Sequence, residues 1–278
     1  MSPALIFDCD GVLADTELDG HLPAFNEMFA EVGLPVRWDE DEYVRLLAIG
    51  GGKERLRAAL GAEIAARATD AVARDALVAG WHELKTRLYI DRVLAGRLPA
   101  RPGVRRLVAE AADEGWALAV ASTSAESSVR AVLEHTVGPE MAGRFGVFAG
   151  EMVPRKKPSP DVYLLAVEAL GADPTETVVV EDSRTGLLAA LAAGLPTIVT
   201  RNRCTVDDDF SGASLVLSSL GEPPAEPADV VSDPLGIGVE GAVDTALLRR
   251  VLAASRRTDP AGVDGSSVRH QGLEPRTR

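Results

Sequence analysis

The stretch Ala4-Leu5-Ile6-Phe7-Asp8-Cys9-Asp10-Gly11 joins four apolar residues to two carboxylates on alternate positions. The apolar run predicts a buried strand, and because side chains alternate along a strand, Asp8 and Asp10 should point to the same side. Two like charges this close repel each other unless a cation lies between them. An ordinary Asp-Gly turn would explain the same residues without any chemistry. The rest of the chain has to decide between the two interpretations.

Composition limits the class of protein without naming a reaction. A chain of 278 residues with 46% hydrophobic residues can bury a large core in one or two domains. A formal net charge of −13 argues against nonspecific binding to nucleic acid or to an anionic membrane. Cys9 and Cys204 form no metal-binding or disulfide pattern, which favours a reducing compartment. No segment has the pattern of a signal peptide, so we expect a cytoplasmic protein, by default a monomer.

Strand-like and helix-like segments alternate through the second half of the chain. Short apolar runs lie at 116–121, 145–148, 177–180 and 197–199, and helical patterns at 104–114, 127–134, 160–170 and 183–193. This alternation predicts an α/β fold with a doubly wound parallel sheet. We assign residues 1–15 and 93–254 to this core, with a last helix at 243–254. The polar tail 255–278 is expected to be disordered.

Residues 16–92 interrupt the alternation with helical spacing and no clear strand. Helical patterns cover 22–32, 40–47, 53–60 and 71–88. The interruption follows the first strand directly, and ligands of open α/β sheets bind beyond the carboxyl ends of the strands. The segment is therefore predicted to be an inserted helical cap over that site.

Three later strand ends carry groups that would complement the opening carboxylates. Ser122-Thr123-Ser124 could hold phosphate oxygens, although a plain helix cap would explain such a run. The basic segment 155–157 ends in Lys157, and a basic loop by itself is usually solvent-facing. Glu181-Asp182 repeats the arrangement of a buried strand that runs into two acids. Carboxylates at two strand ends form an oxygen site suited to Mg²⁺.

In this order the motifs resemble those of the haloacid dehalogenase-like superfamily of phosphotransferases. Asp8-x-Asp10-Gly11-Val12-Leu13 matches its first motif, Ser122 the second, Lys157 the third and Glu181-Asp182 the fourth. The resemblance covers residues 4 to about 200. The position of the insertion is similar to the small helical cap of the β-phosphoglucomutase-like subgroup.

The resemblance implies a phosphatase mechanism with Mg²⁺ as cofactor. Asp8 would be the nucleophile and Asp10 the general acid and base. Asp8, the backbone carbonyl of Asp10 and Asp182 would hold the metal, with Glu181 as a ligand or behind the ligands. Ser122 and Lys157 would stabilise the phosphate oxygens, with Thr123 beside them.

The cap contains a glycine-rich segment, residues 50–55, that could be mistaken for a P-loop. Leu47 stands where that motif needs Gly, and Glu54 stands where it needs Ser or Thr, so the motif is rejected. A glycine turn before a helix that starts with Lys53 and Arg55 can still bind phosphate. An ordinary helix start with surface basic residues is the alternative.

A narrower resemblance, to CbbY-type proteins, concerns the cap. That group includes phosphatases acting on xylulose-1,5-bisphosphate, and its matching segments contact the substrate. The resemblance therefore implies substrate contacts at Glu17, His21, Gly51, Gly52, Lys53, Glu54 and Arg55. His21 could equally be a structural histidine at a helix start. Leu22 departs from the group, in which Arg often follows the His.

The predicted function is a Mg²⁺-dependent phosphatase, a phosphoric monoester hydrolase acting on a small phosphorylated sugar. A bisphosphate would explain two phosphate sites, one in the core and one in the cap. A β-phosphoglucomutase-like mutase shares every core motif and would return the phosphoryl group to sugar. A noncatalytic phosphosugar-binding module is the alternative from a different class. His82, His135 and His270 are interpreted as structural or surface residues.

Overall fold

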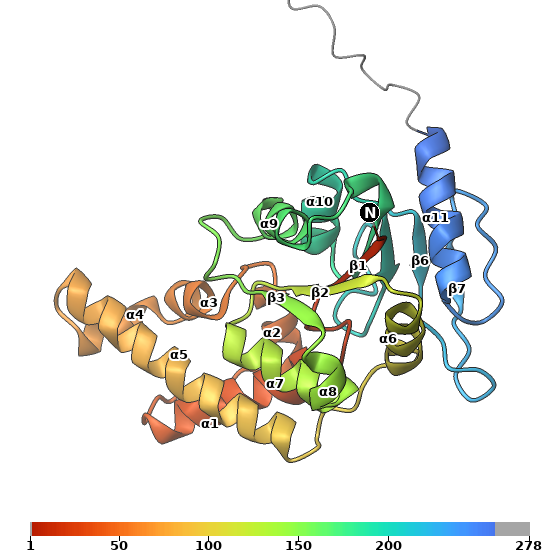
Figure 1. Ribbon diagram of the computed structural model, residues 1–278. Coiled ribbons are helices and arrows are strands. Elements are labelled where there is room, and N and C mark those ends of the chain that lie inside the picture. Colours follow the sequence, from red (N-terminus) through yellow and green to blue (C-terminus); the bar gives the residue numbers. More distant parts are fainter. Residues whose placement is uncertain (1, 259–278) are drawn as a thin grey trace, which may run out of the picture.

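The computed structural model describes residues 2–258 and contains a seven-stranded sheet around which the other elements are arranged (Figure 1). Its order is β3-β2-β1-β4-β5-β6-β7, so the first strand lies in the interior. All neighbours are parallel except β6 and β7. The strands are β1 (Ala4–Phe7), β2 (Ala117–Ala121), β3 (Phe145–Phe148), β4 (Thr177–Glu181), β5 (Thr197–Thr200), β6 (Leu215–Leu217) and β7 (Val230–Ser232).

Helices cover both faces of the sheet, which confirms the doubly wound α/β prediction. Helices α6 (Val104–Asp113), α7 (Glu126–Val137) and α11 (Thr245–Thr258) share one apolar cluster with Leu5 and Phe7. Helices α9 (Asp161–Leu170) and α10 (Arg184–Ala192) share a second cluster with Ile6. Alternate residues of β1 therefore enter opposite layers, as the pleat of a doubly covered strand requires.

The segment between β1 and α6 is helical and gathers on one side of the sheet (Figure 1, orange). It has its own apolar cluster, in which Phe25, Phe29 and Trp38 form a group of ring contacts. Its elements are a π-helix (Glu17–His21), α1 (Leu22–Glu31), α2 (Glu40–Leu46), α3 (Gly52–Ala59), α4 (Gly61–Arg67) and α5 (Ala71–Leu94). Near the end of α5, Tyr89 and Val93 join the core cluster instead, so this long helix links cap and core.

The structure also adds elements that the sequence did not predict. Strands β6 and β7 have three residues each, too few to show an alternating pattern. The π-helix, α4 and α8 (Pro139–Ala142) are similarly short. Helix α5 runs six residues beyond its predicted end, across the expected boundary at 92 and 93. Helix α11 ends at Thr258, so residues 255–258, assigned to the disordered tail, are helical; the rest of that tail lies outside the described residues.

Both cysteines are free. Cys9 is buried in the core cluster between the two carboxylates of the first motif, as expected of a small core residue. Within residues 2–258, no helix combines the length and apolar character needed to cross a bilayer.

Candidate active site

The carboxyl ends of the central strands bring the predicted core residues together. Phe7 of β1 is in register with Val120 of β2 and Val180 of β4, so the residues that follow these strands emerge at one edge. Beyond that edge is a cavity of about 830 Å³ between core and cap. Of the predicted site residues, Asp8, Asp10, Glu17, His21, Gly51, Gly52, Lys53, Arg55, Ser122, Thr123, Lys157 and Asp182 line it. Glu54 and Glu181 do not.

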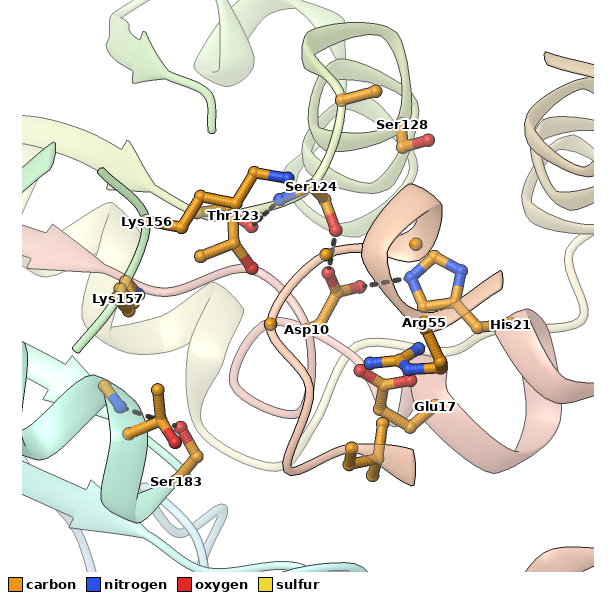
Figure 2. A pocket seen from close by; sticks show the side chains of 18 of the residues that line it. Asp10, Glu17, His21, Arg55, Thr123, Ser124, Ser128, Lys156, Lys157 and Ser183 are labelled. Carbon is orange, nitrogen blue, oxygen red and sulfur yellow. Dashed lines mark hydrogen bonds and ion pairs between the residues drawn. The ribbon is translucent and has the colours of Figure 1, made fainter. Parts of the chain in front are cut away.

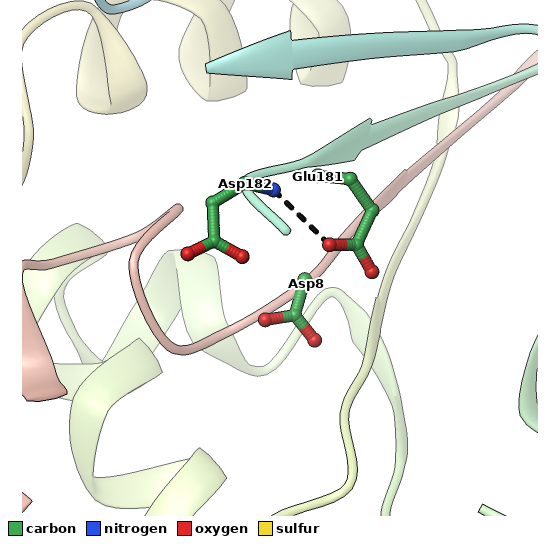
Figure 3. Close-up of side chains that lie close together, drawn as sticks. All are labelled: Asp8, Glu181 and Asp182. Carbon is green, nitrogen blue, oxygen red and sulfur yellow. Dashed lines mark hydrogen bonds between the residues drawn. The ribbon is translucent and has the colours of Figure 1, made fainter. Parts of the chain in front are cut away.

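Three carboxylates lie close together at this edge of the sheet, and two of them, Asp8 and Asp182, line the cavity (Figure 3). One oxygen from each of Asp8, Glu181 and Asp182 lies within 4.8 Å of the others, and all three residues are buried. Burial, with the charges of Glu181 and Asp10, raises the pKa of Asp8 to about 7 against the opposing effect of Lys157. Burial and the negative charges of Glu181 and Asp8 raise the pKa of Asp182 well above its ordinary value. This concentration of negative charge is what a hard cation would neutralise.

Glu181 is engaged by protein groups at both oxygens. Its Oε1 accepts hydrogen bonds from Lys157 Nζ (2.6 Å) and the Tyr163 hydroxyl, and its Oε2 accepts from the Asp182 amide (3.0 Å). Gly186 of α10 lies so close that any side chain there would collide with the Glu181 carboxylate. Glu181 is therefore fixed in place, with Lys157 held against one of its oxygens.

Lys157 links that fixed acid to the candidate nucleophile. Its Nζ donates to Asp8 Oδ1 at 2.6 Å as well as to Glu181. Although burial by itself lowers the pKa of Lys157, the two carboxylates raise it well above its ordinary value. The ammonium is consequently charged and lies directly against Asp8 Oδ1.

Asp10 is held by three side chains, of which Figure 2 shows Ser124 and His21. Thr16 Oγ1 and Ser124 Oγ donate to its two oxygens at 2.6 and 2.5 Å, and His21 Nε2 lies 3.1 Å from Oδ1. Burial alone would raise the pKa of Asp10, but His21 and these hydrogen bonds lower it below its ordinary value. The pKa of Asp8 and the pKa of Asp10 are thus shifted in opposite directions, because Asp8 lies among other carboxylates and Asp10 among hydrogen-bond donors.

His21 is held by protein contacts at both ring nitrogens and on one ring face. Its Nδ1 lies 2.8 Å from Lys85 Nζ, and its ring stacks on Tyr89 with centroids 3.9 Å apart. Accepting from Lys85 at Nδ1 leaves the ring proton on Nε2, where it can be donated to Asp10. Burial lowers the pKa of Lys85 to about 8. Of the two sequence interpretations of His21, the structural one describes its contacts, although the ring still borders the cavity.

Glu17 and Arg55 are connected through a tyrosine of the cap. The Tyr43 hydroxyl donates to Glu17 Oε2 at 2.5 Å and accepts from Arg55 at 3.0 Å. The Arg55 guanidinium also donates to the carbonyls of Leu46 and Ile49 and is 7% exposed. Three of its five N–H donors are therefore directed at α2 and the turn that follows it, while the side chain also borders the cavity.

The glycine turn at the start of α3 touches the core. Gly51 has φ +98°, and a side chain there would collide with Lys156 and Glu54. Lys156 Nζ donates to both Glu54 oxygens, at 3.0 and 2.9 Å, so Glu54 joins cap to core outside the cavity. Lys53, by contrast, is exposed and forms no ion pair within residues 2–258.

Several residues of the site were not predicted. Asn202 follows β5 and donates to Asp182 Oδ2 at 2.7 Å, so reading one more strand end would have found it. Ser124 lies in the same hydroxyl run as Ser122 and Thr123, one residue beyond those selected. Lys85 and Tyr43 come from cap helices, where no local pattern distinguishes them from surface or core residues.

Comparison with known proteins agrees with this geometry. Residues 3–194 match the family model of a haloacid dehalogenase-like hydrolase. The chain is 48% identical over 231 residues to a CBBY-like protein of Arabidopsis thaliana, covering 82% of this chain and 72% of that protein. It is 47% identical over 225 residues to the plasmid-encoded protein CbbY of Cupriavidus necator, covering 81% and 87%.

A solved structure extends the comparison to three dimensions. It is a crystal structure of a CbbY variant from Rhodobacter sphaeroides in complex with xylulose-1,5-bisphosphate. The two chains are 39% identical with a TM-score of 0.70, and the match covers 79% of this chain and 95% of the other. The similarity includes both core and cap, because the covered share of the other chain is nearly complete.

Proposed function

The chain is a phosphatase of the haloacid dehalogenase-like hydrolase family, and we propose that it is a Mg²⁺-dependent enzyme acting on small phosphorylated sugars. The observation that carries the proposal is the contact between Lys157 and Asp8 at the floor of a cavity roofed by a cap. A sugar bisphosphate such as xylulose-1,5-bisphosphate fits best, because the cavity offers cationic groups in the core and, at Lys53, in the cap. The bisphosphate bound to the CbbY protein of Rhodobacter sphaeroides supports the same choice.

The donor set fits a hard divalent cation. Lys157 occupies Asp8 Oδ1 and Asn202 occupies Asp182 Oδ2, which leaves the second oxygen of each carboxylate for a metal. The backbone carbonyl of Asp10 would be a third ligand, while Glu181 stays behind Lys157. Mg²⁺ bound there would supply positive charge against the phosphoryl oxygens.

The protein's own groups divide the chemistry between two carboxylates. Asp8 attacks phosphorus, a bond forms from its oxygen to phosphorus, and the bond to the sugar oxygen breaks. Asp10 donates a proton to that leaving oxygen and later takes one from the water that hydrolyses the aspartyl phosphate. Because a bound phosphate dianion repels a nearby carboxylate, substrate binding favours the protonated form of Asp10 that this first step needs. Ser122 and Lys157 hold the phosphate oxygens in line.

The cap would bind the second phosphate through the turn before α3. The first backbone N–H groups of α3 lack partners within the helix, and Lys53 adds a charge that no acid of residues 2–258 pairs with. Glu17, fixed by Tyr43, would accept a hydrogen bond from a sugar hydroxyl. Arg55 would support this turn from behind instead of gripping the phosphate.

A screen of phosphate release across phosphorylated sugars tests the proposal. Xylulose-1,5-bisphosphate should give the highest kcat/KM, and chelation of Mg²⁺ with EDTA should abolish release until the metal is restored. With β-glucose 1-phosphate, the same assay should detect free phosphate if any turnover occurs. Conversion to an isomeric sugar phosphate without release would instead identify a mutase, and binding without any turnover would identify a noncatalytic module.

A further inference from the structure

His82 lies on the cap helix α5, half-buried, and lines the same cavity as Gly52 and Lys53. A Cβ placed on Gly52 would be 2.6 Å from His82 Nε2 and 2.7 Å from its Cδ2. The imidazole edge therefore occupies the space that a side chain at position 52 would need. Residue 52 has to be glycine for this ring to rest against the first turn of α3.

The ring is polar but has no protein partner. Within residues 2–258, neither nitrogen of His82 takes part in a hydrogen bond or ion pair, in contrast to His21, which uses both. One edge of the imidazole packs against α3, and its nitrogens have no hydrogen-bond partner in the described protein. They can therefore bind a ligand in the cavity.

The charges around the ring are mostly positive. Lys53 comes from α3, Lys85 from α5 and Lys156 from the loop before α9, and the ring of His21 faces His82 from the π-helix. Glu54 of α3 is neutralised by Lys156, and Glu83 is the acid next to His82 on α5 that also borders the cavity. Burial, together with these cationic neighbours, lowers the pKa of His82 to about 3, so the ring is neutral in the free protein.

We propose that His82 is a ligand of the second phosphate, donating a hydrogen bond from its ring beside Lys53 and the start of α3. This inference rests on the proposed function and deepens it by naming a residue that selects bisphosphates. A dianion bound among these groups would oppose the charges of the lysines and raise the pKa of His82, which favours proton uptake when the bisphosphate binds. The residue would then contribute little for a substrate with one phosphate.

The test compares His82→Asn with the wild type on xylulose-1,5-bisphosphate and on p-nitrophenyl phosphate. Asn keeps a donor of similar reach but cannot be protonated. We expect KM for the bisphosphate to rise about tenfold, the size of a lost charge-assisted hydrogen bond, with kcat nearly unchanged. KM for the aryl phosphate should change by less than about twofold. His135→Asn, a histidine substitution on core helix α7, is the matched control and should leave both substrates unaffected.

A second readout separates ligand binding from a structural role. Between pH 8 and pH 6 the wild type should gain affinity for the bisphosphate relative to His82→Asn, and this ratio cancels the ionisation of the phosphate itself. In an Asp8→Asn background, titration calorimetry in buffers of different ionisation enthalpy should show greater proton uptake when His82 is intact than when His82→Asn is added.

The outcomes distinguish the two proposals. A wild type that does not prefer the bisphosphate over the aryl phosphate overturns the proposed substrate and this inference together. A preference that His82→Asn retains overturns the role of His82 alone. Equal losses on both substrates, or an unchanged pH ratio, would make His82 a packing residue and overturn the inference as well.

Discussion

The two ends of the cavity are built in opposite ways. At the core end, Asp10, Lys157 and Glu181 are held by hydrogen bonds from their own protein. At the cap end, Lys53 has no ion-pair partner and His82 has no hydrogen bond within residues 2–258. Groups that take part in bond breaking gain from being fixed in advance, whereas groups that recognise a substrate need free donors. The difference indicates which residues should control kcat and which should control KM.

Two ion pairs connect the core to the cap. Lys156 of the core binds Glu54 of the cap, and Arg203 of the core lies 3.1 Å from Glu40 of the cap. The cations belong to the core and the acids to the cap in both pairs. Because the partners are partly exposed, each pair contributes little to overall stability. We expect the two pairs to help hold the cap over the site.

Replacement of the candidate nucleophile is the strongest test of the core end. Asp8→Asn should lower kcat by about 10⁴-fold or more, because an amide cannot form the aspartyl phosphate. The fold should survive, since the change removes a charge from a crowded acidic cluster and lowers repulsion there. Phosphate release and thermal unfolding measure the two effects. Retained turnover in a folded variant would show that Asp8 is not the nucleophile.

A smaller effect is expected from a substitution at Gly186, which packs against Glu181. Gly186→Ala places a methyl group against the Glu181 carboxylate, which has no free space to move into. We expect a loss of about 1–3 kcal/mol in the free energy of unfolding, together with a lower kcat as Lys157 shifts. Denaturant unfolding and steady-state kinetics measure both.

Gly80→Ala is the matched control for this substitution. Gly80 lies in the exposed part of α5, and a Cβ there would meet nothing within 4 Å. The change should stabilise the protein by about 0.5–1 kcal/mol through helix propensity and leave kcat unaltered. Similar responses at the two glycines would mean that crowding at Glu181 is not what requires Gly186.

The difference between the core end and the cap end of the cavity also explains how much of the site the sequence could predict. Consecutive parallel strands must end at one edge, so reading the residues after each strand located Asp8, Ser122, Lys157 and Asp182 at the cavity. The rule applies equally to Asn202 after β5, which was overlooked because that strand end was not read. In the cap, no such rule exists. The positions of Lys85 and His82 depend on how helices pack, and a single sequence does not specify this.

Arg55 shows that the charge of a residue in the sequence does not predict which groups it contacts in the folded protein. Its position in a basic glycine-rich turn predicts a phosphate ligand. The fold also brings the carbonyls of Leu46 and Ile49 and the Tyr43 hydroxyl to its guanidinium. Acceptors contributed by residues six to twelve positions away cannot be recognised before the turn that presents them is known.

Lys53 and Arg55, the two cations at the start of α3, provide the last test of the difference between free and fixed groups. Lys53→Met should raise KM for xylulose-1,5-bisphosphate about tenfold, because an exposed ammonium contributes to phosphate binding alone, and should leave the melting temperature unchanged. Arg55→Met should destabilise the protein by about 1–3 kcal/mol, because it leaves Tyr43 and two carbonyls without their donor. Kinetics on the bisphosphate and on p-nitrophenyl phosphate, with thermal unfolding of both variants, measure these effects. If Arg55→Met kept its stability and lost only bisphosphate affinity, Arg55 would be a direct ligand as the sequence predicts, and the cap turn would release its anchor when substrate binds.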